Sequence, residues 1–354
     1  PTARWFSGLQ PEYGLSMRKP NRKYEVPKAL MAARLEVGWL NVARVRALCL
    51  AVHGYDPEIE NWDQSLFHHN ESGSQNMTTL AVAGKSAIVP LIEGHAATRE
   101  RWTANLTTFS NEERLKAEGP PHIECMFKAT SEGPLERLLW EHVRSRGYGL
   151  WVSVTTSEKG SYRQADVLAF LDRHLPKVDE SQSRRWRIIM ADDYSAHFSQ
   201  QVFSVCWSRR YAIIPHGGGV TPVAQTPDTD LNQWVKREYT DRETCDLLRQ
   251  MRGGTVVPQL RQEGCIDIMV DVLSNIDLHL NAAKGYLRTG MPVDLDGLQD
   301  QEIVREAGAF WTELGMRTNM NSAAADIRED HNAKRLSWNV EDIQRIIRPY
   351  PTNK

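Results

Sequence analysis

The stretch "RRWRIIMADDYSAH", residues 184–197, decides the fold that we predict for this chain. Its apolar run from Ile188 to Ala191 is short, rich in β-branched residues and bounded by charges, which indicates a strand. Because side chains alternate along a strand, Asp192 and Asp193 must leave it on opposite faces. Both faces are apolar up to Ala191, so we expect this strand in the middle of a sheet that is covered on both sides.

Short β-rich runs and helical patterns alternate on either side of this strand. The β-rich runs are IENWD (59–63), MTTLAVAG (77–84), RWTANLTTF (101–109), HIECMFKA (122–129), LWVSVTT (150–156) and YAIIP (211–215). Helical patterns cover residues 134–147, 162–175 and 197–210, and residues 1 to about 55 and those after Asn232 are almost entirely helical in pattern. Several strands followed by alternating helix and strand predict a mixed α/β sheet covered by helices.

Composition limits the classes of function. The chain has 354 residues and a net charge of −2, so it has no global basic field and any nucleic-acid surface must be local. Its 5 cysteines are widely spaced, which is typical of reduced thiols in an intracellular protein. No run approaches the roughly 18 apolar residues of a membrane helix, so we expect no membrane contact. Because the chain begins at Pro1, we also expect further sequence upstream.

The paired carboxylates Asp192 and Asp193 allow two interpretations. Asp193 or Ser195 can cap a helix that starts near His197, where such side chains satisfy free backbone N–H groups. A second charge at the edge of a buried strand is costly without a partner. In open α/β sheets the crevice beyond the carboxyl ends of the strands is where ligands bind.

Other acidic residues could share such a crevice. Asp63 ends a short strand, and Asp228 and Asp230 stand at the start of a helix, where capping is again an alternative. Carboxylates that gather at one point need cations to stay ionised, and Mg²⁺ or Mn²⁺ prefer such oxygen ligands. The pattern alone leaves a two-metal centre open against ordinary helix caps. The HGGG run at residues 216–219 is similar to the oxyanion-hole loop of esterases, but no G-x-S-x-G follows it in the sequence.

Residues 188–239 resemble the signature half of the DDE endonuclease superfamily, and most closely the pogo, Tigger and jerky-like transposases that include centromere protein B. DDYSAH is similar to the family's Asp-Asn-x-x-x-His motif, IPHGGGVT to its I-P-G-G-x-T loop, and QTPD to its Q-P-L-D motif. Upstream, IENWDQSLF resembles the N-x-D-E-T stretch, and WFSGLQPEYGLSMRKPNRK the end of a helix-turn-helix DNA-binding module. The likeness covers roughly residues 5 to 240.

The resemblance implies a ribonuclease H-like fold, a mixed α/β sheet flanked by helices with helical N- and C-terminal extensions. It implies that Asp63 lies on the first strand, Asp192 ends the fourth, and Asp228 lies on the last catalytic helix. These three would be the catalytic residues and the ligands of two Mg²⁺ or Mn²⁺ ions. Asp193, His197 and Asp230 would support them, and Asp230 is an alternative third ligand if Asp228 only caps its helix.

The resemblance also implies an organisation and a partner. Residues 1–55 would be the end of a DNA-binding module with a helical linker, 56–240 the catalytic domain, and 241–354 a helical C-terminal region. Double-stranded DNA would be the partner, in the nucleus of a eukaryotic host, and the family allows a homodimer. The predicted DNA contacts are Arg18, Lys19, Arg22, Lys23, Lys236 and Arg237.

The chemistry implied is attack on a phosphodiester by water and then by a DNA 3′-hydroxyl, which excises and reinserts an element. Three departures from the family pattern leave the acidic residues in place: Asp193 replaces asparagine, Gln64 replaces glutamate, and Thr226-Pro227 replaces Pro-Leu. They keep open a domesticated DNA-binding or chromatin protein with weak or no nuclease activity. An unrelated phosphatase-like α/β protein is a third reading, which an entirely parallel sheet would favour.

Overall fold

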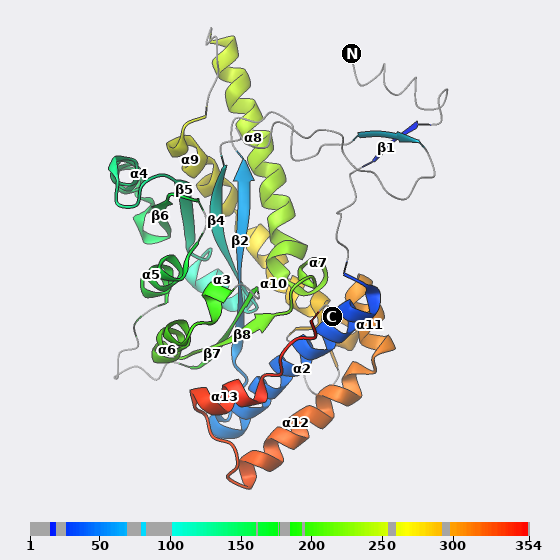
Figure 1. Cartoon of the computed structure of the whole chain (residues 1–354). Coiled ribbons are helices and arrows are strands. Elements are labelled where there is room, and N and C mark those ends of the chain that lie inside the picture. The colour runs from blue at the N-terminus through cyan, green and yellow to red at the C-terminus, as the bar shows by residue number, and fades with distance from the viewer. Residues whose placement is uncertain are drawn as a thin grey trace.

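The computed structural model describes residues 15–18, 26–68, 79–82, 101–160, 162–175, 177, 185–192, 195–253, 260–291 and 298–352. A sheet of 6 strands with the order β6-β5-β4-β2-β7-β8 lies at its centre (Figure 1). The strands are β2 (Glu58–His68), β4 (Arg101–Phe109), β5 (Ile123–Lys128), β6 (Val152–Ser157), β7 (Arg187–Asp192) and β8 (Tyr211–His216). Each of them overlaps one of the predicted β-rich runs.

The sheet mixes antiparallel and parallel pairs. Strand β4 is antiparallel to β2 and β5, whereas β5–β6, β2–β7 and β7–β8 are parallel. The entirely parallel sheet that a phosphatase-like protein would need is therefore not formed. Strand β7 lies between β2 and β8, with Ile188 and Met190 in one core and Ile189 and Ala191 in another. The prediction of a central strand buried on both faces is confirmed.

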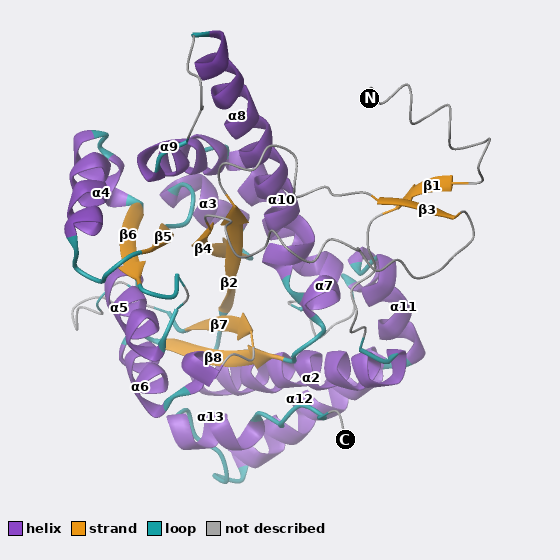
Figure 2. Ribbon diagram, turned by 45° about the horizontal axis from the view of Figure 1, so that its top comes forward, coloured by secondary structure: helices purple, strands orange, loops and turns teal. Residues whose placement is uncertain are grey.

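Helices cover both faces of the sheet (Figure 2). One face packs on α2 (Lys28–His53), α10 (Ile276–Thr289), α11 (Arg305–Glu313), α12 (Met316–Asn332) and α13 (Val340–Ile346). The opposite face packs on α5 (Gln164–His174) and α6 (Gln200–Ser208), and the β4–β5–β6 end packs on α4 (Pro134–Ser145), α8 (Asn232–Arg252) and α9 (Gln262–Leu273). The predicted mixed α/β sheet flanked by helices, with helical extensions, is confirmed. No described helix combines the length and apolarity needed to cross a membrane.

The N-terminal segment differs in part from the prediction. Residues 15–18 form strand β1 (Leu15–Arg18), which pairs antiparallel with β3 (Thr79–Val82), and the prediction of helix there is wrong. The pairing partner lies far downstream, and local periodicity cannot reveal such a partner. Arg18 ends this strand, while Lys19, Arg22 and Lys23 lie outside the described residues. The rest of the predicted DNA-binding module before residue 26 also lies outside them.

The helical extensions share one core with the sheet. Trp39 of α2, Ile188 of β7 and Met320 of α12 belong to a single buried apolar cluster. Figure 1 shows α2, α12 and α13 lying together beside the sheet. The division of the chain into domains at residues 55 and 240 stays a prediction. The described parts of all three predicted domains contribute to this one buried cluster.

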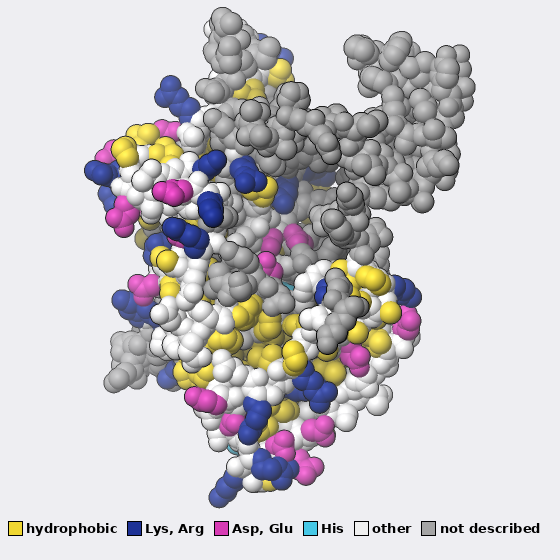
Figure 3. Space-filling model, viewed as in Figure 1, with side chains coloured by type: hydrophobic (Ala, Val, Ile, Leu, Met, Phe, Trp, Pro, Cys, Tyr) yellow, Lys and Arg dark blue, Asp and Glu magenta, His cyan; other side chains and the backbone are white. Residues whose placement is uncertain are grey.

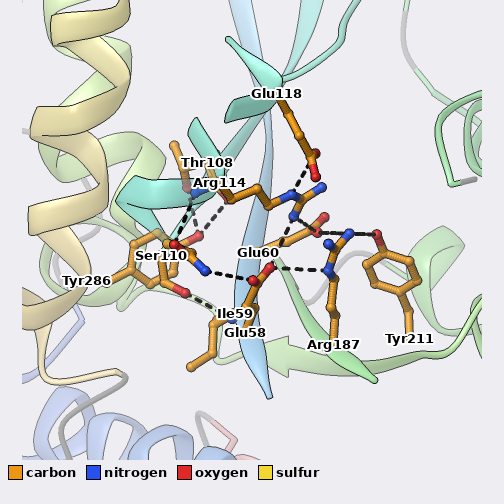
Figure 4. A network of polar contacts seen from close by, with 11 residues as sticks. Glu58, Ile59, Glu60, Thr108, Ser110, Arg114, Glu118, Arg187, Tyr211 and Tyr286 are labelled. Atoms are coloured by element: carbon orange, nitrogen blue, oxygen red, sulfur yellow. Dashed lines mark hydrogen bonds and ion pairs between the residues drawn. The ribbon is translucent and has the colours of Figure 1, made fainter. Parts of the chain in front are cut away.

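A polar network fixes the start of β2 (Figure 4). Arg114 of α3 (Glu112–Glu118) lies 2.5 Å from Glu60 and 2.9 Å from Glu118. The Tyr211 hydroxyl donates to the same Glu60 carboxylate at 3.2 Å, and Arg187 lies 3.2 Å from Glu58. The network joins α3 to three neighbouring strands through side chains that are mostly buried.

The glycine loop after β8 is a packing feature. A Cβ atom at Gly217 would overlap the ring of Tyr350, whose hydroxyl donates to the Pro215 carbonyl at 2.6 Å. Gly219 has a φ of 81° and packs against Val26, just before α2. The HGGG run thus packs closely against Val26 on one side and Tyr350 on the other. This close packing explains its glycines, and no oxyanion hole is needed to account for them.

Candidate metal centre

The sheet places Asp63 and Asp192 side by side. In the parallel pair of β2 and β7, Asn61 lies opposite Met190. Asp63 and Asp192 each lie two residues beyond this pair on the same face of the sheet, and the charge of Asp192 raises the pKa of Asp63. Asp192 ends the fifth strand of the sheet along the described chain and not the fourth, because β6 forms at the sheet edge before it.

Asp228 reaches the same place from a helix start. It lies on the π-helical turn Pro227–Leu231 that leads into α8. Asn232 donates from Nδ2 to Asp228 Oδ1 at 2.7 Å and also to Asp63 Oδ2. Gln225 donates from Nε2 to Asp63 Oδ1 at 2.9 Å. The Asp63 and Asp228 carboxylates therefore share one amide, although 164 residues of chain separate them.

The electrostatics of Asp63 show that the three acids interact. Burial, followed by the charge of Asp228, raises the pKa of Asp63 to about 7. The charge of Asp192 acts in the same direction, whereas the Asn232 hydrogen bond and the charge of Lys236 lower this pKa. Negative charge at this point thus exceeds what the neighbouring donors and lysine compensate, and a cation would relieve the excess.

His197 holds Asp192 from the side. Its Nδ1 lies 2.7 Å from Asp192 Oδ1, and its Nε2 lies 3.0 Å from the amide nitrogen of Gln64. Because an amide nitrogen only donates, His197 accepts at Nε2 and carries its proton at Nδ1, which faces both the carboxylate and the backbone carbonyl oxygen of Asp192, the latter at 3.3 Å. The Asp192 side chain is 46% exposed, so the carboxylate keeps access from solvent.

Other predicted supporting residues lie elsewhere. Asp230 is buried and faces α10, where Arg288 Nη1 lies 2.5 Å from its Oδ1. It is therefore engaged in an ion pair and is not brought to Asp63. The helix α6 begins at Gln200, later than predicted, and is capped by Ser199, which accepts from the Val202 backbone N–H at 3.3 Å. Asp193 lies outside the described residues.

The donor set can be compared with the demands of a divalent ion. In the part of the chain that the structure describes, no three Asp, Glu, His or Cys side chains stand together as a ready-made metal site. The carboxylates are instead held by amides and by His197. The carboxylates supply hard oxygens, and the Gln225 and Asn232 carbonyl oxygens are buried without a partner among the described residues. The chemistry of the set fits Mg²⁺ or Mn²⁺.

Basic residues flank the carboxylates on α8. Lys236 is one turn beyond Asn232, and its charge acts on Asp63. Arg237 stacks over the exposed ring of Trp234, with its guanidinium carbon 4.1 Å from the ring centroid. Figure 3 shows a small group of acidic side chains near the middle of one face, with Lys and Arg side chains above it.

The structure adds residues that the sequence pattern missed. His216 of β8 lies opposite Asp192, and its Nε2 is 2.9 Å from Asn61 Nδ2. Burial lowers the pKa of His216 to about 4, so it is neutral at physiological pH. Spacing could have pointed to two of them, since Asn61 precedes Asp63 by two on a strand and Asn232 follows Asp228 by four on a helix.

Comparison with known proteins gives distant structural likenesses. No family model and no curated protein sequence matches the chain. Among solved structures, the Mos1 mariner paired end complex with Mn has a TM-score of 0.41 and 10% identity, covering 86% of this chain and 72% of that chain. The Mos1 strand transfer complex has a TM-score of 0.39 and 11% identity, covering 81% and 66%. This chain thus spans just under two thirds of the second one, and both likenesses concern the course of the chain and not its side chains.

Proposed function

We propose that this chain is a transposase-type DNA endonuclease and strand transferase that acts in a nucleus. The observation that supports the proposal is the amide of Asn232 shared by Asp63 and Asp228, together with the charges of Asp228 and Asp192, which both raise the pKa of Asp63. Carboxylates that repel one another do not stabilise the fold, because burying them without a cation is costly. A site for hard divalent ions accounts for it.

The residues divide the work as follows. Asp63, Asp192 and Asp228 would hold two Mg²⁺ or Mn²⁺ ions, which supply an activated oxygen nucleophile and charge neutralisation for phosphoryl transfer. His197 orients Asp192, and Gln64 fixes the proton on the side of His197 that faces the carboxylate. Lys236 and Arg237 offer positive charge beside the site for the phosphates of double-stranded DNA.

Cleavage of DNA tests the proposal directly. Purified protein should nick supercoiled plasmid DNA in the presence of Mn²⁺ and join a 3′-hydroxyl oligonucleotide to it. Asp192→Asn should lower the nicking rate by on the order of a hundred-fold or more, since losing one charge-stabilising group in a preorganised site has effects of that size. Gel electrophoresis of the nicked circle measures the rate.

Asp172→Asn is the matched control, because this carboxylate is exposed on α5 and pairs only with Arg209 at 2.6 Å in the described structure. It should nick as fast as the parent protein. Equal nicking by Asp192→Asn and the parent would overturn the assignment of the site.

A second function, a domesticated DNA-binding protein without cleavage, is favoured by one observation. Amide donors occupy both carboxylate oxygens of Asp63, and the described residues form no ready-made metal site. A protein of this kind would bind DNA through its basic residues and would give no nicking with Mn²⁺ at any concentration. A DNA-binding assay run beside the nicking assay separates the two functions.

A further inference from the structure

Two amide side chains surround the candidate metal centre and belong to the same segment as Asp228. Gln225 follows α7 (Thr221–Ala224), and Asn232 is the first residue of α8. Their side chains are 0% and 2% exposed. Such deep burial of two amides next to carboxylates requires that each amide atom be accounted for.

The orientation of the Asn232 amide follows from its neighbours. Ionised carboxylates only accept hydrogen bonds, so the Nδ2 group must face Asp63 and Asp228, and it lies 2.7 Å from Asp228 Oδ1. The Asn232 Oδ1 atom is bonded to the same carbon and therefore lies at the edge of the same group. It is buried and has no hydrogen-bond partner among the described residues.

An unpartnered buried carbonyl oxygen of this kind points to a ligand. Side-chain amide oxygens are among the oxygen ligands that hard divalent cations accept. A half-turn of the amide about its last side-chain bond exchanges Nδ2 for Oδ1, and this torsion is soft. The same residue can therefore present a donor to the two carboxylates or an acceptor beside them.

We propose that Asn232 is a positioning residue with two settings, and that it belongs to the cation-binding set. Without a cation its amide donates to both carboxylates and keeps Asp63 and Asp228 together against their repulsion. With a cation its Oδ1 is a further ligand beside those carboxylates. The inference deepens the proposed function and rests on it for the second setting only.

Two substitutions of Asn232 separate the settings. Asn232→Leu removes both the donor and the acceptor at similar volume, so it should lower the melting temperature in EDTA by roughly 3 °C or more and weaken Mn²⁺ binding. Asn232→Asp keeps the shape but adds a carboxylate, so it should also melt earlier in EDTA and yet bind Mn²⁺ about ten-fold more tightly. Thermal melts and isothermal titration with Mn²⁺ alone measure the two effects.

The matched control is Asn41→Leu, at a buried asparagine of α2 that donates to the Arg348 carbonyl at 3.0 Å. It should melt earlier to the same extent with and without Mn²⁺, and its Mn²⁺ affinity should equal that of the parent. If Asn232→Asp behaves like this control, the inference is overturned. Should Asn232→Leu fail to fold, the comparison of Asn232→Asp with Asn41→Leu decides it.

The failure of the inference differs from that of the proposed function. A parent protein that nicks DNA while Asn232→Asp leaves the Mn²⁺ affinity unchanged overturns the inference alone. A parent protein that neither binds Mn²⁺ nor nicks DNA overturns the proposed function and, with it, the second setting. In that case, unchanged melting of both Asn232 variants in EDTA overturns the first setting as well.

Discussion

At the scale of single residues, the polar cluster around Glu124 shows how burial decides charge. Glu124 is fully buried on β5. Its Oε2 atom lies 3.4 Å from His174 Nε2, and its carboxylate forms an ion pair with Arg173. Burial alone would raise the pKa of Glu124, but His174 and Arg173 lower it below its usual value. His122 lies beside this cluster, with its ring centroid 3.8 Å from that of His174.

Acid should destabilise the fold through His122. Burial, and then the neighbouring His174, lower the pKa of His122 to about 3, far below the ordinary histidine value of about 6.5. A lowered pKa means that the stabilising contribution is complete above the unfolded value and is lost as the pH falls from about 6.5 towards 3. At pH 5 the loss relative to pH 7.5 should be about 2 kcal/mol. Urea unfolding across this range measures it.

His122→Asn removes the titrating group and should flatten that part of the pH dependence. In the parent protein, the chemical shifts of the His122 imidazole, followed by NMR, should be those of a neutral ring at pH 5. A His122 pKa at or above 6 would contradict the prediction.

The sequence identifies the acidic residues of the candidate site but not the amide residues beside them. Asp63, Asp192 and Asp228 could be singled out because each stands next to a recognisable apolar or motif pattern. Gln225 and Asn232 could not, since an amide in a turn has many ordinary uses and its partners are chosen by tertiary packing. Asp230 has the same sequence context as Asp228. Only the structure shows that Asp230 forms an ion pair with Arg288 of α10 and does not face Asp63.

At the scale of elements, the ion network of β2 ties one short helix to the sheet. Arg114 has a side chain only 10% exposed and contacts Glu60, which is 4% exposed. The guanidinium also lies 3.7 Å over the ring of Phe109. Removing Arg114 leaves the buried Glu60 carboxylate with the Tyr211 hydroxyl and with Arg187 at 3.6 Å, so its charge is then only partly compensated.

Arg114→Met should therefore cost about 1.5 to 3 kcal/mol of folding free energy, the usual range for losing a hydrogen bond to a charged group. Chemical denaturation followed by circular dichroism gives the value. Adding Glu60→Gln to the variant should recover part of the loss, because the uncompensated charge is then gone. A loss below about 1 kcal/mol for the single variant would show that Glu60 is solvated.

Strands and helices were largely predictable because their periodicity is local. Alternation of apolar residues marks β4, a continuous apolar run marks β7, and helical spacing marks α4 and α5. The strand at residues 15–18 could not be predicted, since its partner at 79–82 lies in another part of the sequence. The helix predicted to start near His197 begins at Gln200, because the residues Ser195–Phe198 form a separate short 3₁₀ turn. The sequence alone could not fix this start, since several residues between 193 and 199 are equally good caps.

At the scale of the whole molecule, the first and last helical segments pack into one layer. Met320 of α12 is fully buried in the cluster that also holds Trp39 of α2 and Ile59 of β2. No pattern along the sequence announces this contact, because it joins residues nearly three hundred positions apart. The layer covers the face of the sheet from which Asp63 and Asp192 project.

Met320→Lys should destabilise the whole described body and not one segment of it. Burying an unpaired ammonium there should cost at least about 3 kcal/mol. Urea unfolding followed by tryptophan fluorescence and by circular dichroism should give one shared transition, shifted to lower urea. Two separate transitions would show that the helical layer unfolds independently of the sheet.

The contact between Tyr350 and the glycine loop has a consequence for how the protein is made. Synthesis runs from the N-terminus, so the loop at Gly217 leaves the ribosome long before Tyr350 can pack on it. That loop leads through α7 into the turn that carries Asp228. The contact that Tyr350 makes with this loop can therefore form only after translation has passed residue 350.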